Sequence, residues 1–169
     1  MKYERFEDLP VWRSAIELAV GIFALTEKPS FRGRGDVKDQ MERAVVSISN
    51  NIAEGFERGT TQELLTFIYI ARGSVGELRS MLLFLERLPT FHDLKSEISN
   101  LKSLAESVSR QLRSWADSLQ NSEIKGQRYL TEKMRHSATT SQERQKFMEE
   151  LRRCQEENIA RAQKANQGE

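Results

Sequence analysis

Residues 64–86 read LLTFIYIARGSVGELRSMLLFLE, and this stretch decides the fold class. Its apolar residues recur at alternating steps of three and four, which places them on one face of an α-helix. We name this set the core row of the helix: Leu64, Ile68, Ala71, Val75, Leu78, Leu82 and Leu85. Thr60 with Glu63 forms a capping-box pattern that predicts the start of the helix, and Pro89 is expected to end it.

The same stretch holds more apolar residues than one face of a bundle can bury. Because successive residues of a helix turn by about 100°, the additional apolar residues point in other directions. They are Leu65, Phe67, Tyr69, Ile70, Met81, Leu83, Phe84 and Leu88. A helix that is apolar on most sides needs burial on most sides. We therefore expect a second packing surface, supplied most simply by further copies of the chain.

Small residues share one broad stripe of this helix with two aromatic residues. The stripe consists of Tyr69, Gly73, Gly76, Ser80 and Phe84. A glycine in the middle of a helix costs about 1 kcal/mol relative to alanine, so the two glycines require a reason. Either a neighbouring helix approaches closely here, or the glycines admit a bulky side chain from within the bundle.

Three further segments show the same helical periodicity. Their predicted core rows are Leu9, Trp12, Ile16, Ala19 and Phe23; Met41, Val45, Ile48, Ile52 and Phe56; and Leu94, Ile98, Leu101, Ala105, Val108, Leu112, Trp115 and Leu119. Asp8 and Asp36 are candidate helix caps, and residues 30–35 are expected to form a loop. No segment alternates with period two, and short connections make neighbouring helices antiparallel. The sequence thus predicts an all-α, antiparallel up-down four-helix bundle over residues 1–120.

Residues 121–169 differ in composition from the rest of the chain. The first half of this segment has few apolar residues, and the second half is rich in Glu, Arg, Gln and Ala. We expect a linker followed by a charged C-terminal helix, or else a disordered tail. A thin apolar stripe of Phe147, Leu151 and Cys154 could recruit a partner.

Polar residues form a second row on the predicted second helix. The row contains Arg43, Ser47, Asn50, Glu54 and Arg58, and Asn51 lies beside it. Adjacent asparagines are unusual inside a helix, because their side chains compete for backbone hydrogen bonds. A solvated face, a polar contact between subunits and a ligand surface all remain open. Glu54 and Glu77 are potential buried acids, which Arg43 and Arg72 could pair with.

Composition limits the classes of function. The formal net charge is +1, so there is no overall basic field. The single cysteine and the absence of a long apolar run fit a cytoplasmic protein that does not enter membranes. The two histidines, His92 and His136, adjoin no nucleophile or metal-ligand pattern. We expect no enzymatic activity, cofactor, metal or small-molecule substrate.

Three motifs resemble one known family. Residues 40–55, QMERAVVSISNNIAEG, resemble the signature of the four-helix-bundle family related to the 23S rRNA intervening-sequence protein, which reads Q, any two residues, R-A, then S-I and N-I-A-E-G. Residues 6–12, FEDLPVW, resemble the family's opening of the first helix, and residues 71–78, ARGSVGEL, resemble its third-helix motif. The resemblance extends over about residues 6–120 and leaves out the C-terminal segment.

The resemblance implies an architecture and a class of partner. Members are bacterial up-down four-helix bundles that assemble into rings, usually pentamers. The distantly similar accessory variability determinant of diversity-generating retroelements binds a reverse transcriptase and nucleic acid through a basic surface of its ring. By resemblance, we expect a homo-oligomeric accessory protein that acts with RNA or with a nucleic-acid enzyme such as a reverse transcriptase.

Two sets of residues are candidates for these contacts. Affinity for phosphate comes from clustered Lys and Arg. The candidates for nucleic-acid or partner binding in the predicted bundle are Arg32, Arg34, Arg43, Asn50, Asn51, Arg58, Arg72 and Arg79. Those in the C-terminal segment are Lys125, Arg128, Lys133, Arg135, Arg152 and Arg153. The candidates for the oligomer interface are Ser47, Glu54, Tyr69, Gly73, Gly76, Ser80 and Phe84. The near-neutral charge also favours an alternative, a protein-interaction adaptor with no nucleic-acid role.

Overall fold

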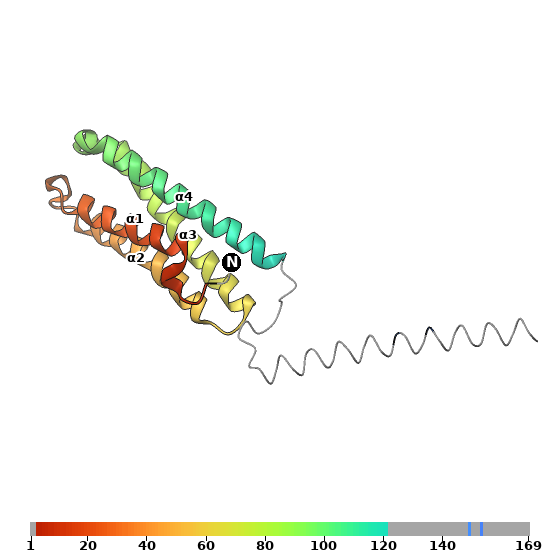
Figure 1. The fold of residues 1–169 in the computed structure, drawn as a ribbon. Coiled ribbons are helices and arrows are strands. Elements are labelled where there is room, and N and C mark those ends of the chain that lie inside the picture. The colour runs from red at the N-terminus through yellow and green to blue at the C-terminus, as the bar shows by residue number, and fades with distance from the viewer. Residues whose placement is uncertain (1–2, 122–148, 150–152, 154–169) are drawn as a thin grey trace, which may run out of the picture. The chain divides into compact units, whose positions relative to one another are not determined.

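Four α-helices form an antiparallel bundle in the computed structural model, which describes residues 3–121, 149 and 153 (Figure 1). The helices are α1 (Pro10–Thr26), α2 (Gly35–Glu57), α3 (Thr61–Glu86) and α4 (Lys95–Gln120). Helices α2 and α4 each pack against both α1 and α3, so α1 and α3 lie on a diagonal. Residues 3–121 contain no β-strand. The predicted all-α four-helix bundle is confirmed, whereas the predicted linker and C-terminal helix or tail lie outside the described residues.

The core rows predicted for α2 and α3 are confirmed. Every member of both rows is buried. In α4, the row from Ile98 to Leu112 is buried, and Leu94, Trp115 and Leu119 at the two ends are half-buried. Each buried Leu or Ile contributes about 1.5–3 kcal/mol of transfer free energy, so these rows supply most of the drive for folding.

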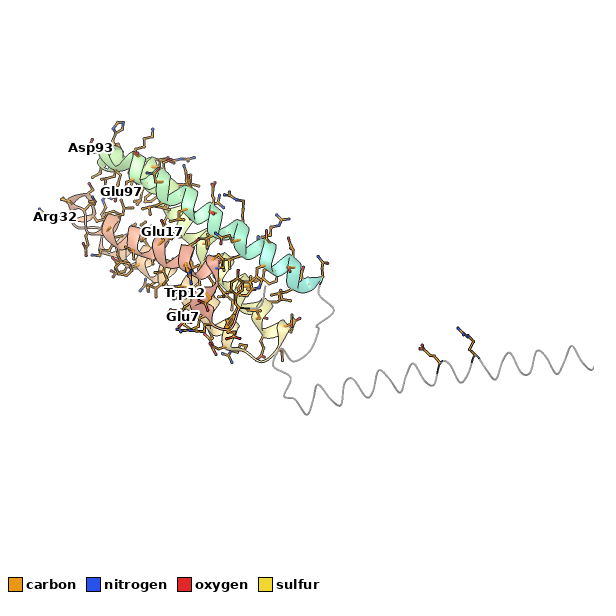
Figure 2. The ribbon with its side chains drawn as sticks, viewed as in Figure 1. Glu7, Trp12, Glu17, Arg32, Asp93 and Glu97 are labelled. Carbon is orange, nitrogen blue, oxygen red and sulfur yellow. The ribbon has the colours of Figure 1, made fainter. Side chains whose placement is uncertain are left out.

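The core row predicted for α1 is wrong in most of its members. Leu9 is buried, but Trp12 at the start of α1 (Figure 2) is half-buried and Phe23 is exposed. The observed core row is Val11, Ala15, Leu18, Ile22 and Leu25. Both rows satisfy the spacing of three and four, because α1 is apolar on most of its circumference. Packing against α2 and α4, which spacing does not reveal, selects the row that enters the core.

Of the three predicted helix caps, only the one at the start of α3 is confirmed. At α3, the Thr60 Oγ1 atom accepts a hydrogen bond from the Glu63 N–H at 3.2 Å and donates one to the Glu63 carboxylate at 2.7 Å. The prediction that Asp8 and Asp36 cap helices is wrong, because the residues before α1 and α2 are Leu9 and Arg34 and neither makes a side-chain cap.

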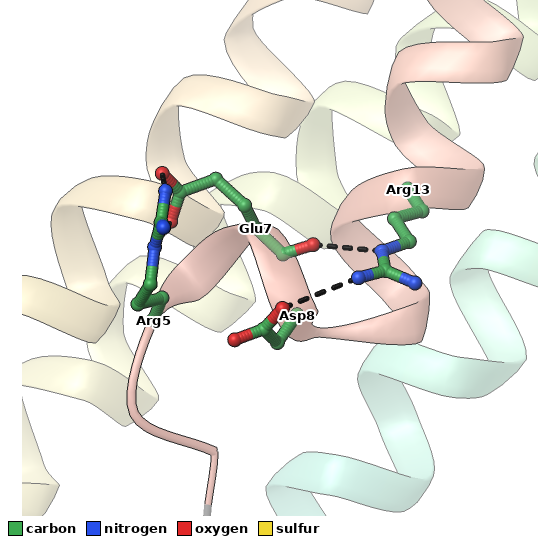
Figure 3. A network of polar contacts seen from close by, with 4 residues as sticks. All are labelled: Arg5, Glu7, Asp8 and Arg13. Atoms are coloured by element: carbon green, nitrogen blue, oxygen red, sulfur yellow. Dashed lines mark hydrogen bonds and ion pairs between the residues drawn. The ribbon is translucent and has the colours of Figure 1, made fainter.

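Asp8 serves a different purpose at the start of the chain. It ends a short 3-10 helix, Phe6–Asp8, and its carboxylate accepts a hydrogen bond from the Arg13 Nη2 atom at 3.2 Å (Figure 3). The Arg13 Nε atom also donates to the Glu7 carbonyl oxygen at 2.8 Å. The arginine therefore fixes this segment against the first turn of α1.

Two connections pack together at one end of the bundle, which we call the loop end (Figure 1). The segment expected to be a loop contains part of a 3-10 helix, Pro29–Phe31, and a second 3-10 helix spans Pro89–Leu94. The buried rings of Phe31 and Phe91 meet edge to face with centroids 4.9 Å apart. This aromatic pair joins the α1–α2 connection to the α3–α4 connection.

Gly55 allows α2 and α3 to approach closely. A Cβ atom added at Gly55 would lie 2.6 Å from the Cβ atom of Phe67 and 3.5 Å from the Leu64 carbonyl oxygen. Cβ and backbone atoms cannot rotate away, so only a shift of one helix relieves the contact. Glycine at this position is therefore a requirement of helix packing.

We predict that Gly55→Ala destabilises the chain by about 1–3 kcal/mol, the usual cost of overpacking, although alanine favours helix formation. Urea denaturation followed by circular dichroism measures the change. The control is Gly35→Ala, where an added Cβ meets nothing within 4 Å. Equal stability of wild type and Gly55→Ala would show that the two helices separate without cost.

Candidate interaction surfaces

The outer side of α3 exposes large apolar side chains. Tyr69, Ile70, Leu83 and Phe84 are 42%, 47%, 42% and 52% exposed. Part of the predicted apolar excess is used inside the bundle, because Leu65 is buried and Phe67, Met81 and Leu88 are half-buried. The exposed parts of the other four side chains are covered by no described residue.

The stripe of small residues on α3 is open. A Cβ atom added at Gly73 or Gly76 meets no heavy atom within 4 Å. Tyr69, Ser80 and Phe84, the other members of the stripe, are exposed. The interpretation that these glycines admit a side chain from within the bundle is therefore wrong. Their absent side chains leave a flat surface on the outside of the molecule.

This stripe leans toward α4, and its neighbours on that side are polar. Tyr69 accepts a hydrogen bond from the Gln120 Nε2 atom at 2.7 Å, and Arg79 forms an ion pair with Glu106 at 2.9 Å. The guanidinium of Arg72 stacks over the Tyr69 ring at 5.9 Å and has no carboxylate partner among the described residues. We call the surface formed by Tyr69, Arg72, Gly76, Ser80, Leu83 and Phe84 the α3–α4 face.

A second apolar patch lies where α1 meets α2. Val20, Phe23 and Val46 are 67%, 40% and 38% exposed. Phe23 and Val46 line a shallow groove together with Asp39 and Asn50. We call the surface formed by Val20, Phe23, Asp39, Val46 and Glu57 the α1–α2 face. Glu57 belongs to it because it follows Val46 by eleven residues, close to three helical turns.

Sequence reasoning missed the α1–α2 face. The spacing predicts Phe23 in the core and predicts no role for Val20 or Val46. The available signal was the presence of two apolar rows on α1, of which only one can enter a bundle core. The second row, with Ile16 and Ala19 half-buried beside Phe23, runs along the edge of α1 and continues into this patch.

The polar row of α2 is divided between internal contacts and solvent. The hydroxyls of Ser47 and Ser74 share a hydrogen bond of 2.9 Å that joins α2 to α3. Asn51 donates to the Ser47 carbonyl oxygen at 2.7 Å and to the Ser47 hydroxyl at 3.0 Å. These contacts explain one of the two adjacent asparagines, while Asn50 is exposed.

The expected buried acids are not buried. Glu54 is exposed and pairs with Arg58, one turn later on α2, rather than with Arg43. Glu77 is exposed, with no ion pair to Arg72. Arg58 also stacks over the Phe67 ring at 4.9 Å. The prediction of structural pairs with Arg43 and Arg72 is therefore wrong.

The candidate basic residues are spread over the bundle. Arg32 lies at the loop end (Figure 2). Arg34 lies there too, because it donates a 3.3 Å hydrogen bond to Thr90 and stacks over the Phe91 ring at 5.6 Å. Arg58 lies at the opposite end of α2, about 35 Å away for a helix of this length. Arg43 is exposed between them. One chain does not gather these residues into a single patch.

Electrostatic shifts in the bundle arise from ion pairs at its surface. The hydrogen bond from Lys102, 2.8 Å long, lowers the pKa of Glu86 and ties α4 to α3. A hydrogen bond from Arg5 lowers the pKa of Glu7. Among the described residues, no cluster of three or more His, Cys, Asp or Glu side chains is placed to bind a metal. None of the described helices has the length and apolar character that crossing a bilayer requires.

Comparison with known proteins identifies the family. The family model of the 23S rRNA-intervening sequence protein matches residues 7–114. This chain belongs to that family. The matched region contains both apolar faces and the α2–α3 polar contact. A search of curated proteins finds no match.

We predict that Glu86→Gln lowers the stability of the chain at neutral pH and leaves it nearly unchanged in acid. The folded pKa of Glu86 is lowered, so its ion pair stabilises the folded state above the unfolded pKa, near 4.5, and this stabilisation is lost as pH falls through the folded pKa. Melting temperatures measured from pH 3 to pH 7 test this. A constant difference between wild type and variant across the range would exclude a role for the carboxylate charge.

Proposed function

We propose that this family member is a non-enzymatic cytoplasmic protein that forms a homo-oligomeric ring, a pentamer, and acts as an RNA-associated binding or accessory protein. The observation that carries the proposal is the exposed apolar side of α3, with Tyr69, Leu83 and Phe84 uncovered beside two open glycines. Burial of such a surface against other copies removes apolar area from water, the main drive for stable association.

The proposed RNA role rests on the family and on the arginines. The name of the family connects its members to an intervening sequence of 23S rRNA. Arg32 and Arg43 are exposed and make no ion pair among the described residues. A ring repeats each arginine once per subunit, so residues that are scattered on one chain become a circular array. Such an array suits a phosphate backbone, because each neutralised phosphate adds to the affinity.

The charge balance favours the second candidate, a protein-interaction adaptor without a nucleic-acid role. Residues 1–120 contain 16 basic and 17 acidic side chains, so a ring has no strong overall field. The adaptor would use the same ring with a protein as partner. The proposed contact through Phe147, Leu151 and Cys154 lies outside the described residues.

We predict that Gly73→Ala and Gly76→Ala weaken the assembly while raising the stability of the separate subunit. In a solvated helix each substitution stabilises by about 0.5–1 kcal/mol, whereas two methyl groups at a helix contact hold the helices apart. Sedimentation of the wild type should give five times the 19.5 kDa of one chain, and the double variant should dissociate at higher concentration. Gly59→Ala, also free of neighbours within 4 Å, is the control. A compact monomeric wild type at micromolar concentration would exclude the ring.

We predict that Arg32→Ala lowers affinity for a structured 23S rRNA fragment by roughly tenfold and reduces the dependence of binding on salt, because each subunit loses a phosphate contact. Fluorescence anisotropy at several salt concentrations measures both effects. The control is Arg5→Ala, since Arg5 is already paired with Glu7 at 2.6 Å. If wild type binds no tighter than a neutral control protein, the RNA role is excluded and the adaptor is favoured.

A further inference from the structure

The two apolar faces lie on opposite sides of the bundle. Helices α1 and α2 are adjacent, α3 and α4 are adjacent, and each pair forms one side of a four-cornered arrangement. The α1–α2 face and the α3–α4 face therefore point away from each other, and no chain can cover one with the other. A two-fold contact through either face would leave the second exposed, whereas a head-to-tail contact covers both.

The apolar residues of the two faces lie at the same height. Helices α1 and α3 run parallel, and both end at the loop end, so Phe23 and Phe84 each lie within about one turn of that end. Val46 follows the start of α2 by eleven residues, and Gly76 precedes the end of α3 by ten, which places both about 15–17 Å from the loop end. Rotation about an axis parallel to the bundle preserves these heights and brings Val46 opposite Gly76.

Shape and charge also fit across these faces. Val46 projects from α2 beside the groove, while Gly76 offers space where a side chain would otherwise stand. Asp39 and Glu57 on the α1–α2 face have no ion-pair partner among the described residues. Arg72 on the α3–α4 face likewise has no carboxylate partner there, and its buried Nε atom has no hydrogen-bond acceptor. Within residues 3–121, each face also carries an unpaired charge of the other sign, because Arg43 lines the groove beside Val46 and Glu77 is exposed beside Gly76. Arg43 and Glu77 lie eight and nine residues from the loop-end termini of α2 and α3, so these two opposite charges stand at about the same height, about 12–14 Å from the loop end.

We infer that the α3–α4 face of one copy docks on the α1–α2 face of the next copy in a head-to-tail interface. This inference rests on the proposed homo-oligomer and specifies its contact. Val46 packs against the Gly76 position of the neighbour, and Phe23 and Val20 meet the Phe84 end of its α3. Each subunit uses both faces, and the angle between successive copies determines whether the chain of subunits closes into a ring.

Two variants that each block one face test the inference. Val46→Arg blocks the α1–α2 face, and Gly76→Arg blocks the α3–α4 face. The control is Asn100→Arg, because Asn100 precedes Gln111 by about three helical turns and so lies on the side of α4 whose Gln111 donates to Ser14 of α1 at 3.3 Å. Native mass spectrometry and sedimentation give the size of each protein alone and of the 1:1 mixture.

A head-to-tail interface predicts that each blocked variant is monomeric alone and that the mixture forms a 1:1 dimer and nothing larger. The Val46→Arg chain retains an intact α3–α4 face, and the Gly76→Arg chain retains an intact α1–α2 face, so one contact is restored. Wild type and Asn100→Arg should keep the full assembly.

Three results would overturn the inference: a blocked variant that keeps the wild-type mass, blocked variants that each form dimers alone, or a mixture that stays monomeric. A monomeric wild type would instead exclude the proposed oligomer itself. Circular dichroism confirms that each variant is helical, and a second pair, Phe23→Arg with Leu83→Arg, repeats the test with different side chains.

Discussion

The apolar surface of α3 is the constraint on which the rest of the structure depends. Its core row, from Leu64 to Leu85, is buried, and α2 and α4 pack against the helix on either side. Gly55 lets α2 come close enough for Phe67 to lie between the two helices. Residues 3–121 provide no further helix that lies over Tyr69, Leu83 and Phe84. Within residues 3–121, the fold thus buries one side of α3 and leaves the opposite side exposed.

The polar contacts between helices determine the alignment of the helices more than they determine the stability of the bundle. The bond between Ser47 and Ser74 lies between α2 and α3, and the ion pairs Arg79–Glu106 and Glu86–Lys102 lie between α3 and α4. Ion pairs at partly exposed positions contribute little stability, because water competes for both charges. These ion pairs instead fix the alignment of the helices. A helix that rotated or slid would separate the paired charges, whereas its apolar side chains could form new contacts.

The same alignment links the fold to the proposed function. Only with α3 held in this rotation do its glycines and aromatic residues point outward, and only with α1 held by Val11, Leu18 and Leu25 does Phe23 face α2 at the surface. In the proposed ring, each of the scattered arginines is repeated once per subunit at a constant radius. The proposed association therefore depends on the fold, and the proposed binding of RNA depends on that association.

The amino-acid sequence by itself determined the helices, the core rows of α2, α3 and α4, the Thr60 cap and the family, because these depend on residues near one another along the chain. The choice between the two apolar rows of α1 required the tertiary structure, since both have helical spacing and only contact with α2 and α4 distinguishes them. The same holds for Asp8, whose carboxylate binds Arg13, and for Glu54, whose partner proved to be Arg58. The α1–α2 face could not be read from one helix, because Phe23 and Val46 become neighbours only when the chain folds back on itself.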